Sequence, residues 1–173
     1  MEQVEIRWAN CNDWSALGFI HSESFRKAYQ GIIPDDFLDN FTIEKRQRYY
    51  QKALSEGVEK TALMSVDHKA IGILTVGKCR DDDKDDSYEE IWGIYLLQDY
   101  WGKGHGKMLI NWGIDRLEEW GYFKATLWVL KENTNARRFY EHLGFEFDGT
   151  EKLIKIGKEL IEARYYKSFT IKI

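Results

Sequence analysis

The chain has 173 residues, of which 43% are hydrophobic and 15% aromatic. This length suits one domain with a core of its own, and this composition excludes a disordered chain. The net charge of -4 argues against a nucleic-acid backbone as the main partner. Two cysteines, Cys11 and Cys79, are too few and too far apart for a disulfide framework or a metal cluster.

The sequence predicts neither export nor membrane insertion. No apolar run in it reaches the roughly 18 residues that span a bilayer. The opening segment "MEQVEIRWAN" lacks the basic and apolar zones of a signal peptide. We therefore expect a soluble cytoplasmic protein with no membrane partner and no bound metal.

The first third of the chain predicts a strand and then helices. "VEIRWA" alternates as a strand does, and Asn12 or Asp13 is placed to cap the helix that follows. After Gly31, a short helix is expected in "PDDFLDNF", with Pro34 at its start. A further helix is expected over residues 42–55, ended by Gly57.

Two β-rich runs follow, "KTALMSVD" and "KAIGILTVGKC", and Asp67-His68 between them predicts a hairpin turn. The acidic stretch "RDDDKDDS" comes next. Its simplest interpretation is a solvated hairpin loop. The functional alternative is a surface that attracts a cationic substrate.

The second half predicts a strand in "SYEEIWGIYLL", a helix over residues 104–120, a strand in "KATLWVLK" and a helix in "NTNARRFYEHLGF". "FEFDG" and "LIEARYYKSF" predict two closing strands around a turn near Gly157. No repeat, linker or domain boundary interrupts this order. We expect one mixed α/β domain over residues 1–173.

A glycine-rich segment, "YWGKGHGKML", lies between a predicted strand and a predicted helix. Glycines at 102, 104 and 106 leave the main chain open to close approach, and a helix start carries about half a positive charge. Together these features suit a phosphate. The spacing matches neither the dinucleotide fingerprint nor the ATP-binding loop. A tight turn without a ligand would give a similar pattern.

A second motif makes the segment more specific. The chain resembles the GNAT superfamily of N-acetyltransferases, whose fourth strand runs into a [Q/R]-x-x-G-x-[G/A] loop. That loop corresponds to "IYLLQDYWGKGHGKML", and the family's downstream motif N-x-x-A-x-x-F-Y-x-x-x-G-F corresponds to "NTNARRFYEHLGF". The resemblance covers residues 5–168 and is closest to a bacterial branch whose acceptors are mostly unassigned. Trp101 stands where Gln or Arg is usual, and Gln98 replaces a frequent proline.

The resemblance implies a three-layer α/β fold in which a mostly antiparallel sheet is splayed between its fourth and fifth strands and flanked by about four helices. It also implies that acetyl-CoA lies in the splay as co-substrate, with its pantetheine arm on the main chain of the fourth strand. The cofactor-binding residues would be Tyr95, Leu96, Leu97, Trp101, Gly102, Lys103, Gly104, His105, Gly106, Lys107 and Asn133. For His105 an exposed position at the helix start is the simpler alternative, and for Asn133 a helix cap.

The resemblance further implies catalytic roles for Tyr140 and Glu90. Tyr140 would stabilise or protonate the leaving thiolate, whose reference pKa is near 8.5; the alternative is a core tyrosine. Glu90 would assist removal of a proton from the acceptor amine, directly or through water, while Glu89 points to the opposite face. The alternative is a strand-end charge.

We therefore expect an enzyme that moves an acetyl group to a primary amine of a small molecule or peptide by direct attack. Phe25 and Tyr29 are weak candidates for acceptor contacts. One competing function is a catalytically weak module that binds CoA or acyl-CoA. Another is a doubly wound nucleotide-binding protein, which would need alternating βαβ units. The sequence leaves open the acceptor and the oligomeric state, a homodimer included.

Overall fold

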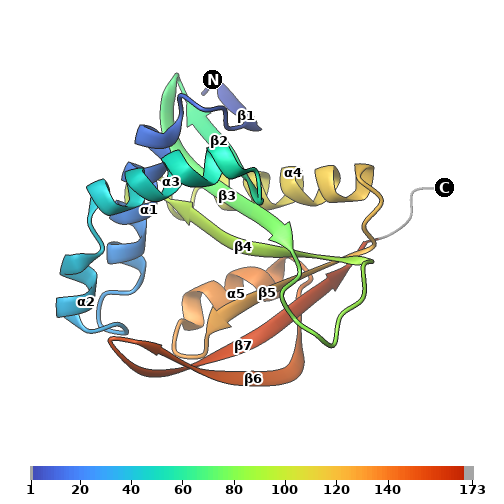
Figure 1. Ribbon diagram of the computed structural model, residues 1–173. Coiled ribbons are helices and arrows are strands. Elements are labelled where there is room, and N and C mark those ends of the chain that lie inside the picture. The colour runs from blue at the N-terminus through green and yellow to red at the C-terminus, as the bar shows by residue number, and fades with distance from the viewer. Residues whose placement is uncertain (1, 170–173) are drawn as a thin grey trace.

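In the computed structural model, which describes residues 2–169, seven strands form one sheet in the order β1-β2-β3-β4-β5-β7-β6 (Figure 1). Every neighbouring pair is antiparallel except β4 and β5. The strands are β1 (Val4–Trp8), β2 (Glu59–Val66), β3 (Lys69–Lys78), β4 (Tyr88–Leu96), β5 (Lys124–Leu130), β6 (Glu146–Ile156) and β7 (Lys158–Ser168).

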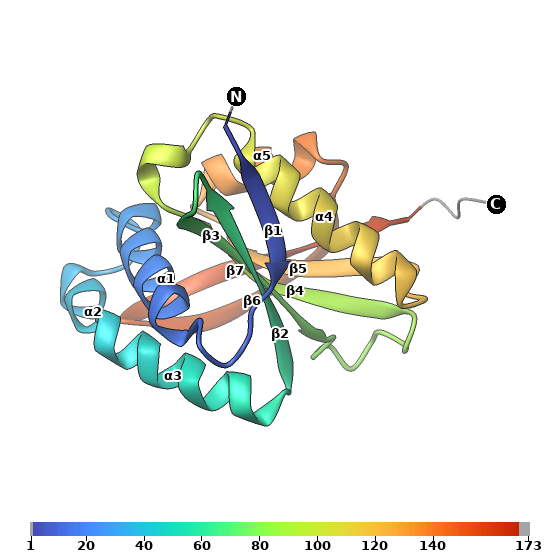
Figure 2. The same cartoon turned by 90° about the horizontal axis from the view of Figure 1, so that it is seen from above.

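Five α-helices accompany the sheet in this part of the chain, where the sequence predicted about four. They are α1 (Trp14–Ala28), α2 (Asp35–Asn40), α3 (Ile43–Glu56), α4 (His105–Glu119) and α5 (Thr134–His142), with one 3-10 turn, η1 (Gln98–Tyr100). Helices α1 and α3 lie on one side of β3 and β4, and α4 lies on the other (Figure 2). The predicted mixed α/β fold with three layers is confirmed.

Most predicted boundaries agree with the structure. Asp67 and His68 both have positive φ, at 48° and 67°, as a tight two-residue hairpin requires. Thr42 caps α3 through its side chain, and Gly57 ends that helix in the left-handed conformation. Asp13, one of the two residues predicted to cap α1, stands at its N-cap position but makes no side-chain capping bond. Its carboxylate accepts two hydrogen bonds from Arg7 instead, at 2.8 and 2.9 Å.

The acidic segment is the hairpin connection between β3 and β4, but its interpretation as a solvated loop is wrong for part of it. The side chain of Asp81 is only 12% exposed, and it accepts a hydrogen bond from the Trp128 indole at 3.1 Å. Asp83 accepts two bonds from Arg164 on β7, at 2.7 and 2.6 Å. The loop is therefore fastened to the C-terminal part of the sheet.

Strands β4 and β5 stay paired over only three positions, Tyr88 with Lys124 through Glu90 with Thr126. A bulge then interrupts the β3–β4 register between Thr75 and Val76, and β4 turns away from β5 (Figure 1). A bulge bends its strand and increases its twist. The sheet is therefore open between β4 and β5, as the resemblance predicted.

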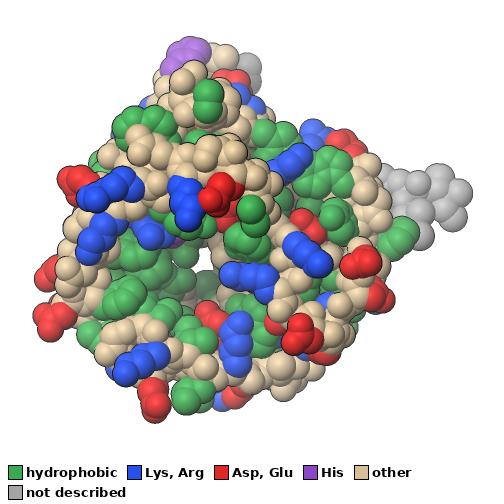
Figure 3. Space-filling view, in the orientation of Figure 1, with side chains coloured by type: hydrophobic (Ala, Val, Ile, Leu, Met, Phe, Trp, Pro, Cys, Tyr) green, Lys and Arg blue, Asp and Glu red, His purple; other side chains and the backbone are tan. Residues whose placement is uncertain are grey.

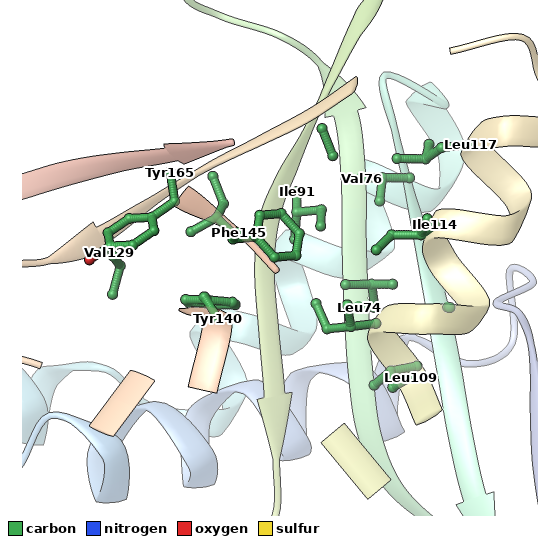
Figure 4. Packing of buried hydrophobic residues seen from close by; sticks show 14 of the residues in the cluster. Leu74, Val76, Ile91, Leu109, Ile114, Leu117, Val129, Tyr140, Phe145 and Tyr165 are labelled. Carbon is green, nitrogen blue, oxygen red and sulfur yellow. The ribbon is translucent and has the colours of Figure 1, made fainter. Parts of the chain in front are cut away.

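The largest core cluster fills the α4 face of the sheet and joins residues from β3, β4, α4, β5, α5 and β7. Tyr140 belongs to this cluster and lies between Val129 of β5 and Ile91 of β4 (Figure 4). The side chain of Tyr140 is therefore placed where the two strands separate.

Candidate functional site

An opening passes through the molecule between the α1–α3 part and the β5–β7 part (Figure 3). Hydrophobic side chains line much of it, with Lys and Arg side chains near its rim. An apolar cluster that includes Phe25, Tyr29, Tyr95, Leu130 and Leu160 joins α1 to β4, β5 and β7. The residues that the sequence predicted as functional lie on α1, β4 and α5, at the ends of α1 and α5, and on the loop that leads from β4 into α4.

The glycine segment has the geometry that an anion site needs. Gly102 and Gly104 have φ of +71° and +88°, and a Cβ at either position would meet no atom within 4 Å. Gly104 is the N-cap of α4, and no side chain caps this helix. The first N–H groups of a helix have no acceptor within it. Residues 102–104 and Lys107 are exposed, and the first N–H groups of α4 are free to donate, although the side chain of His105 in this segment is buried.

Gly106 is close to other elements for a different reason. A Cβ there would lie 3.1 Å from the ring of Phe139 and 3.3 Å from Leu96. This glycine brings the start of α4 against α5 and the end of β4. The third glycine of the motif thus fixes the packing of the elements that surround the opening.

The three predicted main-chain positions on β4 are not equivalent. The N–H of Leu97 donates to the Ile71 carbonyl at 2.9 Å, so it is already used in the sheet. Neighbouring residues of a strand direct their peptide groups to opposite sides, and Leu96 therefore faces the open edge. Its carbonyl accepts a hydrogen bond from the Trp101 indole at 2.7 Å. Trp101 thus reaches the open edge of β4 itself.

His105 does not lie exposed at the helix start, so that alternative is wrong. Its side chain is 3% exposed, and Nε2 lies 3.3 Å from the carboxylate of Glu2. Its other ring nitrogen lies 3.5 Å from the Tyr100 carbonyl. Asn133, in contrast, is a helix cap, because its side chain accepts from the Ala136 N–H at 3.2 Å.

Tyr140 is 8% exposed, and burial raises the pKa of its hydroxyl above the ordinary value of 10.0. Its ring packs against Phe139 and Phe145, with centroids 5.3 and 5.9 Å away. Among residues 2–169 its hydroxyl has no hydrogen-bond partner within the usual distance, yet it is not sealed from solvent. A protonated hydroxyl is thus available in the opening.

Glu90 is 1% exposed and lies beside Arg80, whereas Glu89 points to the opposite face, toward Trp120 and Tyr122, as predicted. Both Glu90 oxygens accept hydrogen bonds from Arg80: Nη2 lies 2.6 Å from Oε1, and Nε lies 3.2 Å from Oε2. The Arg80 main-chain N–H adds a third bond at 3.0 Å. Glu89 lines a separate pocket of about 340 Å³ with Trp120 and Tyr122, and no predicted site residue lies in that pocket.

The two weak acceptor candidates lie in an aromatic group. Phe25 stacks on Phe41 with ring centroids 3.9 Å apart, and Tyr29 lies 4.5 Å from Phe25. The hydroxyl of Tyr95 approaches that of Tyr29, and burial raises the pKa of both. His21 stacks on Tyr95 at 4.4 Å, and burial lowers the pKa of its imidazole to about 3.

Sequence reasoning missed two carboxylates on this side of the sheet. Burial raises the pKa of Glu162 on β7 and also that of Glu59 on β2. Glu162 pairs with Lys152 at 3.5 Å, and Glu59 accepts from the Tyr49 hydroxyl at 2.7 Å. In "LIEARYY", Glu162 shares its strand face with the buried residues Leu160 and Arg164, each two positions away. A charged residue on that face is the signal from which Glu162 could have been found.

Neither a metal site nor a membrane-spanning helix is found in residues 2–169. Over residues 2–169, no group of three or more His, Cys, Asp or Glu side chains is arranged to hold a metal ion. None of the helices in that range combines the length and apolarity needed to cross a membrane.

Comparison with known proteins identifies the family. The model of the acetyltransferase (GNAT) family matches residues 17–145. An uncharacterized N-acetyltransferase of Bacillus subtilis, YuaI, is 26% identical over 133 residues, which are 75% of this chain and 73% of that protein. A spermidine N(1)-acetyltransferase of Thermoplasma acidophilum is 23% identical over 172 residues, covering 95% and 99% of the two chains.

Solved structures agree in fold. The PaiA N-acetyltransferase of Thermoplasma acidophilum in complex with coenzyme A has a TM-score of 0.75 at 21% identity, with 96% of this chain and 99% of that chain covered. The putative acetyltransferase YncA of Salmonella typhimurium, with acetyl-CoA, has a TM-score of 0.72 at 19% identity, with 97% and 95% covered. The chain belongs to the acetyltransferase (GNAT) family, and the predicted enzyme class, an N-acetyltransferase, is confirmed.

Proposed function

We propose that the chain transfers the acetyl group of acetyl-CoA to a primary amine of a small molecule or peptide, by direct attack of the amine in a ternary complex. The observation that carries this proposal is Tyr140, which packs with residues of β4 and β5 in the core cluster and whose hydroxyl has no hydrogen-bond partner within residues 2–169. The similar proteins from Thermoplasma and Salmonella were crystallised with coenzyme A and acetyl-CoA, which supports the choice of cofactor.

The residues present suit the pyrophosphate of acetyl-CoA. The main chain of residues 102–107 would hold it, because its N–H groups are free and Gly102 and Gly104 leave space for close approach. Lys103 and Lys107 would add positive charge nearby. The open edge of β4 would receive the pantetheine arm at Leu96. The Leu96 carbonyl, which already accepts a hydrogen bond from the Trp101 indole, would then also face the arm. Acetyl-CoA supplies a thioester whose carbonyl is open to attack by an amine.

Tyr140 would act as the general acid. Burial holds its hydroxyl protonated at neutral pH, so it can donate a hydrogen bond or a proton to sulfur as the carbon–sulfur bond breaks. A free thiol has a pKa near 8.5, and a donor at that sulfur lowers the barrier most when the negative charge is largest.

The acceptor amine must lose a proton before it attacks. A lysine-like amine has a pKa near 10.4, so deprotonation at pH 7 costs about 4 to 5 kcal/mol. We propose that Glu90 assists this step through a water molecule and not by direct contact, because Arg80 already bonds both of its oxygens. Glu162 is the second carboxylate on this side, and its raised pKa suits it to accept a proton from the amine.

The first acceptors to test are linear polyamines. The Thermoplasma relative is named a spermidine N(1)-acetyltransferase, and the aromatic wall of Phe25 and Tyr29 together with Glu162 suits an alkyl chain that carries a cationic amine. Phe25 and Tyr29 would contact that chain.

The test is release of free thiol from acetyl-CoA in the presence of an amine library, with the acetylated product identified by mass spectrometry. The proposal expects thiol and acetyl-amine in equal amounts. Binding of acetyl-CoA without thiol release, with every amine, would instead favour a module that holds the cofactor without turnover.

A further inference from the structure

A separate pocket of about 340 Å³ lies away from the residues of the proposed acetyl transfer. The connection between α3 and β2, the strands β2, β3 and β4, and the segment that follows α4 all contribute to its wall. Val76, which lines it, packs in the same core cluster as the buried residues of α4. Figure 2 shows the end of α4 beside the start of β4, where the pocket lies. The proposed chemistry uses no residue of this wall.

The buried part of this wall, the floor of the pocket, carries a carboxylate. Glu89 is 8% exposed, and burial raises the pKa of its carboxyl. Its polar neighbour is the Tyr122 hydroxyl, and Tyr122 also lines the pocket. Within residues 2–169 no ion pair includes Glu89, whereas Glu90 pairs with Arg80 at 2.6 Å. A buried carboxylate without a cation is costly, so an ammonium group in the pocket would be bound favourably.

The exposed part of the wall, the rim of the pocket, carries a lysine and an indole. Lys60 and Trp120 are both exposed, and the Lys60 Nζ lies 4.4 Å from the centre of the Trp120 ring. Trp120 also stacks on Trp8, with ring centroids 5.2 Å apart. In the described part of the chain Lys60 belongs to no ion pair. Its ammonium group is therefore available to an anionic group at the rim.

We propose that this pocket binds a small zwitterion in which a short chain joins a primary ammonium group to a carboxylate, as in an amino acid. The ammonium group lies on the floor against Glu89 and the Tyr122 hydroxyl, and the carboxylate lies at the rim beside Lys60. Glu89 and Lys60 line the same pocket and do not pair with each other, so one molecule with both complementary charges can reach both. A ligand with an ammonium group alone would gain nothing from Lys60, and one with a carboxylate alone would be repelled by Glu89.

The test is titration of the full chain with three probes of equal chain length: 5-aminopentanoate, pentylamine and pentanoate. Binding is followed in NMR spectra by the indole N–H signal of Trp120, which the Trp120→Phe variant identifies. The indole signal of Trp128 reports on the other face of the sheet. Trp128 alternates on β5 with Leu127 and Val129, whose side chains lie in the core on the α4 side. The two signals therefore distinguish this pocket from binding of an amine on the acceptor side.

A ligand as small as 5-aminopentanoate is expected to bind with a dissociation constant of roughly 0.1 to 5 mM. Pentylamine should bind at least threefold more weakly, and pentanoate should leave the Trp120 signal in place. Equal binding of 5-aminopentanoate and pentylamine would overturn the zwitterion as the ligand. A Trp120 signal that no probe shifts at about 20 mM, well above that range, or a shift of Trp128 alone, would overturn the site.

Two variants test the two charges separately. Glu89→Gln removes the charge and keeps the shape, and it should weaken binding of 5-aminopentanoate at least tenfold. Lys60→Met should abolish the preference for 5-aminopentanoate over pentylamine; Lys60 is exposed, so this variant serves even if Glu89→Gln does not fold. The control, Asp115→Asn, removes an exposed carboxylate of α4 outside the pocket and should bind as wild type does.

Wild-type binding by both pocket variants would refute the assignment of Glu89 and Lys60. None of these measurements involves acetyl transfer, so their result is independent of the proposed function.

Discussion

Replacing Tyr140 by phenylalanine tests the proposed catalytic role separately from packing, because the substitution removes the hydroxyl and keeps the ring. The ring packs in the core between Phe139 and Phe145, and phenylalanine keeps those contacts. The hydroxyl has no hydrogen-bond partner among residues 2–169, so its removal breaks no bond within them. We expect the free energy of unfolding to change by less than about 0.5 kcal/mol, as for substitutions that disturb no packing or bonding.

Turnover is expected to respond much more strongly. If Tyr140 donates to the leaving sulfur, Tyr140→Phe lowers kcat by about ten- to a thousandfold, which is roughly 1.4 to 4 kcal/mol. The KM for acetyl-CoA should change little where it reflects binding, since the ground-state sulfur gains little from a donor. The assay is thiol release at saturating acetyl-CoA with any accepted amine, together with thermal unfolding of both proteins.

Tyr165→Phe is the matched control. Tyr165 is buried like Tyr140, at 0% exposed against 8%, but its hydroxyl accepts from Arg137 at 3.0 Å and donates to Glu141 at 2.8 Å. Both partners reach water, so losing the two bonds should cost about 1 to 2 kcal/mol, at the low end for charged partners. The control should therefore lose stability and keep its turnover. Wild-type turnover in Tyr140→Phe would refute the acid role.

Three further outcomes are expected. Gly104→Val should weaken CoA binding at least tenfold in a calorimetric titration, whereas Gly121→Val, which has nearly the same φ of +87° and equal space at the far end of α4, should bind normally; equal binding by both would remove the anion site. Glu90→Gln should lower turnover most at pH values below the pKa of the amine, and turnover should recover at alkaline pH. If Glu90→Gln leaves the pH–rate profile unchanged while Glu162→Gln lowers turnover, the base is Glu162 of β7 and not Glu90. The guanidinium beside Asp83 holds its pKa at about 2, so the stability from this contact is present above about pH 4 and is lost as the pH falls toward 2; the thermal midpoint of Asp83→Asn should therefore fall less steeply with acid than that of wild type, and parallel curves would contradict this.

Features that depend on local sequence could be predicted. The sequence predicted an open main chain at Gly102 and Gly104, and both have open space around them. The hairpin at Asp67-His68 followed from its length and residue types. The element order and the family followed from two motifs in the correct order. These features involve residues near one another in the chain, where spacing alone constrains geometry.

Pairings across the fold could not be predicted in this way. The bond between Arg80 and Glu90 crosses a hairpin with a bulge, and a single-residue change of register would turn Glu90 to the other face. Arg164 and Asp83 are 81 residues apart, so nothing in the acidic segment indicates its partner. His105 is buried because Glu2 and Tyr100 happen to meet it, which no property of the helix start indicates.

An opening in the middle of a sheet has a physical cost, because strand edges that would otherwise pair are left exposed and the two parts are free to move. The ion pair of Arg164 with Asp83 between those parts is a weak source of net stability, since Asp83 is 59% exposed and solvent screens the attraction. Bidentate bonds from Arg164 nevertheless allow only one arrangement of the loop relative to β7, whereas apolar contacts would tolerate several. A thioester and an amine must be placed to within a few tenths of an ångström of the geometry for attack. This requirement favours a contact with fixed geometry, such as that of Arg164 with Asp83, over an apolar contact that adds more stability. On this reasoning, an apolar pair in place of Arg164 and Asp83 would preserve folding and still lose the single arrangement of the loop relative to β7.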